Sequence, residues 1–117
     1  MNKVKLISFG FKYGVPRSNY YFDVGFIKNP ARQKDWDFFC DTSPEMCQFV
    51  LEQDIAKQFI EKVIPLINFL ADIDQNQVFA FGCSAGRHRS TVLVDFIAHQ
   101  LRAEGVDVDV EHRDMGN

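Results

Sequence analysis

A short segment that combines small, basic and hydroxyl residues carries most of the chemistry this sequence offers. Its residues, in order, are Cys83, Ser84, Ala85, Gly86, Arg87, His88, Arg89 and Ser90. The segment follows an apolar run of strand composition and precedes an apolar-periodic stretch typical of a helix. Small residues let the backbone bend tightly and turn its N–H groups inward, and the first turn of the helix adds unpaired donors. The segment therefore predicts a binding site for an anion such as phosphate.

Three side chains of this segment have their own expected roles. Arg89 offers a planar fork of N–H donors that can hold a phosphate or carboxylate through two bonds, and Ser90 offers a hydroxyl donor. His88 has two open roles, because its ring can donate to the anion when protonated or can cap the turn structurally. The competing interpretation is a glycine-rich turn that simply joins a strand to a helix, with its arginines in solvent.

Composition points to one compact domain. The chain has 117 residues, of which 46% are hydrophobic and twelve are phenylalanine, so it can bury a single aromatic-rich core. No apolar run approaches the length of a membrane span, and the first residues lead into a strand rather than a signal peptide. We therefore expect a cytoplasmic domain with no membrane association.

The cysteines and the net charge narrow the possible partners. Cys40, Cys47 and Cys83 are an odd number without C-x-x-C spacing, which predicts free thiols and neither a disulfide framework nor a zinc site. No metal or cofactor is expected. The formal net charge of −3 argues against a dedicated nucleic-acid binder.

The chain in order reads as strand, strand, helix, helix, strand, helix, strand. Strands are expected at 4–9, 20–27, 78–81 and 106–111, and helices at 44–52, from 54 onwards, and at 87–104. The segments 11–19 and 28–42 are expected to be loops, the second of them a natural lid. This order predicts an α/β sandwich with a mixed or mostly parallel four-stranded sheet and about three helices. Ligands of such sheets bind beyond the carboxyl ends of the strands.

The second helix carries the clearest apolar periodicity. We expect its core-facing stripe to consist of Ile55, Phe59, Val63, Ile67 and Leu70. Pro65 lies inside it and is expected to kink the helix or split it in two. Gly105 stands where the last helix should end in a left-handed residue.

The central segment also matches the pattern C-x-x-G-x-x-R-[ST], and so resembles the phosphate-binding loop of cysteine-dependent protein tyrosine phosphatases. That resemblance implies a Cys83 thiolate that attacks phosphorus beside Arg89, and a general acid that protonates the leaving oxygen. The candidate acids in the expected lid are Asp35, Asp37 and Asp41. In this sequence Gly82 stands where that family usually has histidine.

A broader resemblance covers nearly the whole chain. The segments SFGFKYGVP at 8–16, FDVGFIKNP at 22–30, GCSAGRHRS at 82–90 and HRD at 112–114 occur in this order. In this order they resemble the C-terminal domain of the RapZ family, which implies that 1–117 is a single, stand-alone RapZ C-terminal-like domain of bacterial type. Nothing in the sequence matches G-x-x-x-x-G-K-[ST], so nucleotide hydrolysis is not implied.

The RapZ resemblance implies a function and a site. Domains of this family sense an amino-sugar phosphate, glucosamine-6-phosphate, and in some members bind small RNA. The resemblance places phosphate binding on 84–90 with Lys12 nearby, and makes Arg113 a further basic contributor. This chain departs from the family at Gly25, where arginine is usual, and at Ala85, where glycine is usual.

Together these patterns favour a non-catalytic, regulatory domain that binds a phosphorylated small molecule or inorganic phosphate or sulfate. The alternative is a cysteine-dependent phosphatase that uses Cys83 and Arg89, and a third interpretation is a stand-alone RNA-binding module. Further expected partners are a separate nucleotide-binding protein or a second copy of this chain.

Overall fold

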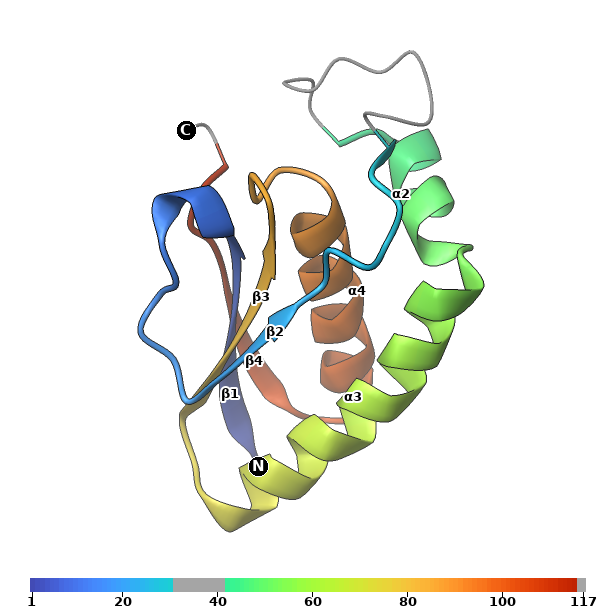
Figure 1. The fold of residues 1–117 in the computed structure, drawn as a ribbon. Helices are drawn as coiled ribbons and strands as arrows, with labels where there is room; N and C mark the ends of the chain where they lie inside the picture. Colours follow the sequence, from blue (N-terminus) through green and yellow to red (C-terminus); the bar gives the residue numbers. More distant parts are fainter. Residues whose placement is uncertain (31–41, 116–117) are drawn as a thin grey trace.

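A parallel sheet forms the centre of the computed structural model, which describes residues 1–30 and 42–115 (Figure 1). Its strands are β1 (Lys3–Gly10), β2 (Tyr20–Asp23), β3 (Gln77–Cys83) and β4 (Asp107–His112). They lie in the order β2-β3-β1-β4, and every neighbouring pair is parallel. The expected α/β architecture with a four-stranded sheet is confirmed, and the sheet is wholly parallel.

Three α-helices and one short 3-10 turn complete the described fold. The helices are α2 (Pro44–Leu51), α3 (Asp54–Ile73) and α4 (Arg89–Ala103), and the turn η1 (Phe11–Tyr13) follows β1. Ser43 caps α2 by accepting from the backbone N–H of Met46, and proline occupies the first turn. Gly105 follows α4 with a φ of 90°, as the sequence predicts.

The helices lie on one face of the sheet and enclose the main core (Figure 1). Strand residues that point to this face alternate with residues that point to the opposite face. The main core includes Leu6, Phe79, Phe81, Leu93 and Ile97, all of them fully buried. The opposite face has a smaller cluster of Ile7, Phe9 and Ala80, with Phe11 and Val78 packed against it. No helix in the described ranges is long and apolar enough to cross a membrane.

The second strand is shorter than the sequence predicts. β2 ends at Asp23 rather than at residue 27, and its last contact with β3 is the bond from Val24 N–H to the carbonyl of Gly82. The Asp23 carboxylate accepts from the N–H of Gly25 at 2.8 Å, a local turn that aspartate forms with the backbone two residues on. This turn directs the chain away from the sheet edge.

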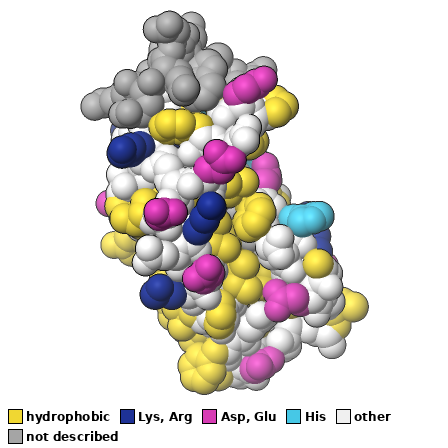
Figure 2. Space-filling model, turned by 90° about the vertical axis from the view of Figure 1, so that its right-hand side faces the viewer, with side chains coloured by type: hydrophobic (Ala, Val, Ile, Leu, Met, Phe, Trp, Pro, Cys, Tyr) yellow, Lys and Arg dark blue, Asp and Glu magenta, His cyan; other side chains and the backbone are white. Residues whose placement is uncertain are grey.

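The core face of α3 agrees with the prediction except at Ile55. Val63 and Ile67 are buried and Phe59 and Leu70 are partly buried against the core, together with the buried Ala56, Ile60 and Ala71, whereas Ile55 is 49% exposed. The helix runs unbroken through Pro65, so the expected split is wrong. Pro65 is solvent-exposed, as is Glu61, so the carbonyl that loses its helical partner can be hydrated instead. Figure 2 shows hydrophobic side chains still exposed on the side of the molecule where α3 lies.

Candidate anion-binding site

The β3–α4 loop is packed directly against the end of β1, with no room for side chains between the two backbones. Gly86 has a φ of 74°, and a Cβ on it would lie 2.5 Å from the backbone nitrogen of Gly10. A Cβ on Gly10 would in turn lie 2.4 Å from the carbonyl carbon of Ala85. Glycine is required at both positions, because backbone atoms cannot move aside as a flexible side chain could. The bend of the loop is therefore fixed by its contact with β1.

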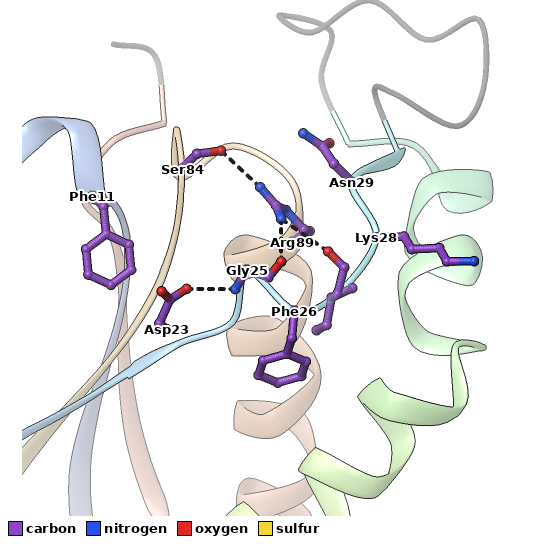
Figure 3. Close-up of a pocket in the computed structure, with 9 residues that line it drawn as sticks. Phe11, Asp23, Gly25, Phe26, Lys28, Asn29, Ser84 and Arg89 are labelled. Atoms are coloured by element: carbon purple, nitrogen blue, oxygen red, sulfur yellow. Dashed lines mark hydrogen bonds between the residues drawn. The ribbon is translucent and has the colours of Figure 1, made fainter.

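Arg89, the first residue of α4, ties this loop to the turn that follows β2 (Figure 3). Its Nη1 donates to the carbonyls of Gly25 and Ile27, each at 3.1 Å, and its Nη2 donates to the Ser84 hydroxyl at 3.0 Å. The side chain is buried, at 9% exposure for the residue. A guanidinium has five N–H donors, so Nε and one N–H of Nη2 have no acceptor among the described residues.

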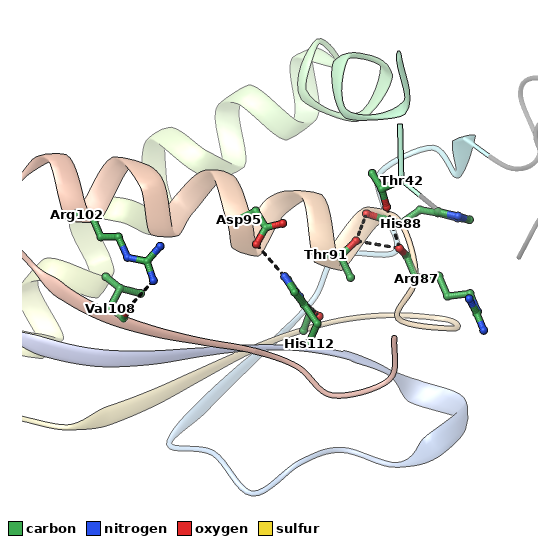
Figure 4. A network of polar contacts seen from close by, with 9 residues as sticks. Thr42, Arg87, His88, Thr91, Asp95, Arg102, Val108 and His112 are labelled. Atoms are coloured by element: carbon green, nitrogen blue, oxygen red, sulfur yellow. Dashed lines mark hydrogen bonds and ion pairs between the residues drawn. The ribbon is translucent and has the colours of Figure 1, made fainter. Parts of the chain in front are cut away.

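Three of the loop carbonyls, those of Ser84, Arg87 and His88, accept from protein donors (Figure 4). The single proton of the Thr91 hydroxyl is shared between the carbonyls of Arg87, at 2.9 Å, and His88, at 3.0 Å. The carbonyl of Ser84 accepts from the backbone N–H of Lys12 at 3.2 Å. These acceptors are engaged with the protein and therefore do not compete for a ligand's donors.

The N–H groups of the same loop behave differently. Those of Ser84, Ala85 and Gly86 donate to no protein acceptor within the part of the chain that the structure describes. Unpaired backbone donors beside a helix N-terminus favour a bound anion. His88 takes the N-cap position of α4 and is only 3% exposed, but its side chain makes no capping hydrogen bond.

An open pocket lies beside Arg89, beyond the carboxyl ends of β2 and β3. Its volume is about 650 Å³. It is lined by Phe11, Asp23, Gly25, Phe26, Ile27, Lys28, Asn29, Ser84 and Arg89. This is where parallel α/β sheets bind ligands. The hollow inside the loop itself holds only about 10 Å³, which is barely enough for one water molecule. The larger space beside the loop is therefore the open pocket next to Arg89.

Cys83 lines the small hollow of the loop, and neither Cys83 nor Ser90 lines the large pocket. The Cys83 thiol is 3.2 Å from the Ser90 hydroxyl, and the two residues are 3% and 0% exposed. Both Cys47 and Cys83 are free thiols, as expected. Within the described ranges, no group of three or more histidine, cysteine or acidic residues could hold a metal ion.

The structure places two predicted basic contributors outside this pocket. Lys12 has its backbone against the loop, but its ammonium lies over the Tyr13 ring, 5.1 Å from the ring centre. Arg113 donates to the carbonyl of Gly14 at 2.6 Å and to the carboxylate of Asp114 at 2.8 Å. Arg113 thus fastens the C-terminal end of the fold to the loop after β1. Asp35, Asp37 and Asp41, the candidate acids, lie outside the described residues.

Sequence reasoning did not find the half of the pocket that follows β2. Asp23, Phe26 and Lys28 line the pocket, and the carbonyls of Gly25 and Ile27 orient Arg89. The available signal was the D-x-G spacing of Asp23 and Gly25, which is typical of an aspartate turn rather than a continuing strand.

The fold is a parallel α/β domain with an open pocket at the strand ends, which Ser84 and the buried Arg89 help to line. The family of the chain follows from comparison with known proteins. The model of the RapZ C-terminal domain family matches residues 2–116, and the chain belongs to this family.

Curated bacterial proteins are similar to this chain along nearly its whole length. A protein named "nucleotide-binding protein" from Desulfovibrio desulfuricans is 37% identical over 119 residues, covering 97% of this chain and 38% of the relative. Proteins of the same description from Symbiobacterium thermophilum and Caldicellulosiruptor bescii are each 36% identical, covering 96% of this chain and 39% and 40% of the relatives. The chain therefore spans about two fifths of the length of the curated relatives it matches.

Proposed function

We propose that this domain binds a phosphorylated small molecule of the amino-sugar phosphate type, such as glucosamine-6-phosphate, as a regulatory and non-catalytic ligand. The observation that carries the proposal is the set of hydrogen-bond donors in the β3–α4 loop and on Arg89 that have no acceptor among the described residues. The N–H groups of Ser84, Ala85 and Gly86 have no described protein acceptor there, and Arg89 keeps two donors for a ligand.

The pocket walls fit the rest of such a ligand. A volume of about 650 Å³ accommodates a hexose beside the phosphate. One oxygen of the Asp23 carboxylate is bound by Gly25 N–H, which leaves the other for the ammonium of an amino sugar. Phe26 is 43% exposed and offers an apolar surface for the sugar ring. Such a ligand belongs to the cytoplasm, and we place the domain there.

Calorimetric titration with inorganic phosphate, glucosamine-6-phosphate and glucosamine tests the proposal. We expect binding of the first two and none of the third. Asp23→Asn keeps a side-chain oxygen that accepts from Gly25 N–H. It should lower the affinity for glucosamine-6-phosphate by roughly tenfold and leave the affinity for inorganic phosphate unchanged. Equal binding of glucosamine and its phosphate would contradict the assignment.

The second candidate function is that of a cysteine-dependent phosphatase. It is favoured by the spacing of Cys83 and Arg89 and by the hydroxyl 3.2 Å from the thiol. The burial of the thiol and the hollow of about 10 Å³ around it favour the binding role, because a tetrahedral anion needs more room. Hydrolysis of a generic phosphate ester distinguishes the two functions. If the domain only binds phosphate, the wild type does not hydrolyse the ester and Cys83→Ser retains the affinity for phosphate. If the domain is a phosphatase, the wild type hydrolyses the ester and Cys83→Ser does not.

We do not extend the proposal to RNA as the main ligand, because the chain carries a formal net charge of −3. Any RNA affinity should fall steeply as salt is raised. Nucleotide binding, which the names of the relatives state, we assign to a separate partner, because the sequence lacks a Walker A loop.

A further inference from the structure

A second pocket, which the proposed anion site does not use, is lined by residues of α2, α4 and the end of β4. Its volume is about 410 Å³, within the range of small-molecule sites. None of its lining residues lines the large pocket at the ends of β2 and β3. Cys47 and Leu51 of α2, Thr91 and Asp95 of α4 and His112 of β4 belong to its wall. Thr91 and Asp95 are four residues apart and therefore share one face of α4.

Two threonine hydroxyls of this wall have already placed their protons on the protein (Figure 4). The proton of Thr91 is shared between the carbonyls of Arg87 and His88, at 2.9 and 3.0 Å. The hydroxyl of Thr42, which also lines the pocket, donates to the carbonyl of Arg87 at 3.3 Å. A hydroxyl has a single proton, so each oxygen keeps only lone pairs for a ligand. Both side chains can therefore meet a ligand only as acceptors.

The Asp95 carboxylate adds a charged acceptor with an oxygen to spare. His112 Nε2 donates to Oδ1 of Asp95 at 2.8 Å, and the Ser8 hydroxyl lies 2.6 Å from Nδ1 of the same ring. Both nitrogens of His112 are thus engaged with the protein, and the ring has no donor left for a ligand. Oδ2 of Asp95 has no partner among the described residues, and the side chain is 67% exposed.

The rest of the wall is neutral or apolar. No lysine or arginine among the described residues lines this pocket. Burial raises the pKa of the Cys47 thiol, and the negative charge of Asp95 raises it further, so the thiol stays neutral near pH 7. Cys47, Asp95 and His112 do not form a metal site. The apolar part of the wall consists of Leu51, Val92, Phe96 and Met115.

We propose that this pocket binds a small molecule in which a primary ammonium group is attached to an apolar body. The ammonium contacts Asp95, and the body lies against Leu51 and Phe96. An ammonium has three N–H donors and no acceptor, which matches a wall whose strong hydrogen-bonding groups can only accept. A carboxylate or phosphate would meet the negative charge of Asp95 without a compensating cation. The pocket therefore selects the opposite charge from the anion site.

Amide NMR titration of the ¹⁵N-labelled chain with three probes of similar shape tests the proposal. The probes are phenethylamine, which is an ammonium near neutral pH, the neutral phenethyl alcohol and the anionic phenylpropionate. We expect phenethylamine to give saturable shifts that are largest at the amides of Cys47, Asp95 and Phe96. Its dissociation constant should be roughly threefold to tenfold lower than that of the alcohol, because the charged contact is partly exposed to solvent. Phenylpropionate should bind more weakly than the alcohol.

Two matched variants locate the charged contact. Asp95→Asn keeps an oxygen that accepts from His112 but removes the charge, so it should abolish the preference for the amine over the alcohol. Asp23→Asn makes the same change in the large pocket and should retain that preference.

The comparison of probes in the wild type can overturn the proposal without any variant. It does so if the amine and the alcohol have equal dissociation constants, or if the amides of Cys47, Asp95 and Phe96 show no saturable shift. A preference for the amine that survives Asp95→Asn, or one that Asp23→Asn removes, would overturn it as well.

Discussion

Replacing Arg89 with alanine should destabilise the fold as well as weaken ligand binding. The guanidinium makes three hydrogen bonds to the protein, and the carbonyl of Ile27 that it serves belongs to a residue only 1% exposed. A hydrogen bond to a charged group contributes about 1.5–3 kcal/mol, while the exposed Gly25 can exchange its lost bond for water. We therefore expect a loss of roughly 3 kcal/mol in the free energy of unfolding, which for a domain of this size lowers Tm by about 10 °C.

Urea and thermal unfolding measure this loss directly, and Arg89→Lys provides the comparison. Lysine keeps the charge, but one ammonium cannot span all three acceptors, so an intermediate loss is expected. At a temperature where Arg89→Ala is folded, its affinity for phosphate should fall by roughly tenfold to a hundredfold. An unfolding free energy within about 1 kcal/mol of the wild type would show that Arg89 does not hold the turn after β2.

Three further predictions follow from the backbone and from two perturbed side chains. Gly86 has a φ of 74° and its Cβ would meet backbone atoms, so Gly86→Ala should lower the free energy of unfolding, measured in urea, by at least about 3 kcal/mol. Gly105 has a φ of 90° but lies in open space, so Gly105→Ala should lower it by only about 1–2 kcal/mol. Burial, with a smaller effect of nearby negative charge, raises the pKa of the Cys47 thiol. Its alkylation near neutral pH, followed by site-resolved mass spectrometry, should therefore be slower than that of free cysteine and should accelerate as pH rises. The hydrogen bond to Glu111, 2.8 Å away, raises the pKa of Lys5, so this pair stabilises the fold below the ordinary lysine pKa of 10.5 and loses its effect as pH rises above that value. Because both side chains are more than a third exposed, Lys5→Ala should cost less than about 1 kcal/mol at neutral pH.

Local patterns were sufficient to predict most of the fold. The alternation in 106–111 and the apolar run at 78–81 each correspond to a strand, and Ser43 followed by proline marks the start of α2. These signals are local, because capping and side-chain alternation act within a few residues. The sheet proved wholly parallel, an outcome that the strand and helix order allowed without requiring.

The remaining features depend on contacts between distant segments. The apolar content of 24–27 resembles a strand, but Arg89, more than sixty residues further on, holds the carbonyls of Gly25 and Ile27 in a turn. The placement of Arg113 on the carbonyl of Gly14 likewise joins opposite ends of the chain. On α3 periodicity identified the core face at Phe59, Val63, Ile67 and Leu70, and only Ile55 in its first turn lies outside it.

The central claim is that the β3–α4 loop directs its backbone N–H groups at an anion. Titration of the ¹⁵N-labelled protein with inorganic phosphate, followed residue by residue in amide NMR spectra, tests it most directly. The account predicts that the largest shifts fall on the amides of Ser84, Ala85 and Gly86 and saturate together with calorimetric binding. Saturable binding that leaves these three amides unshifted while others move would contradict it.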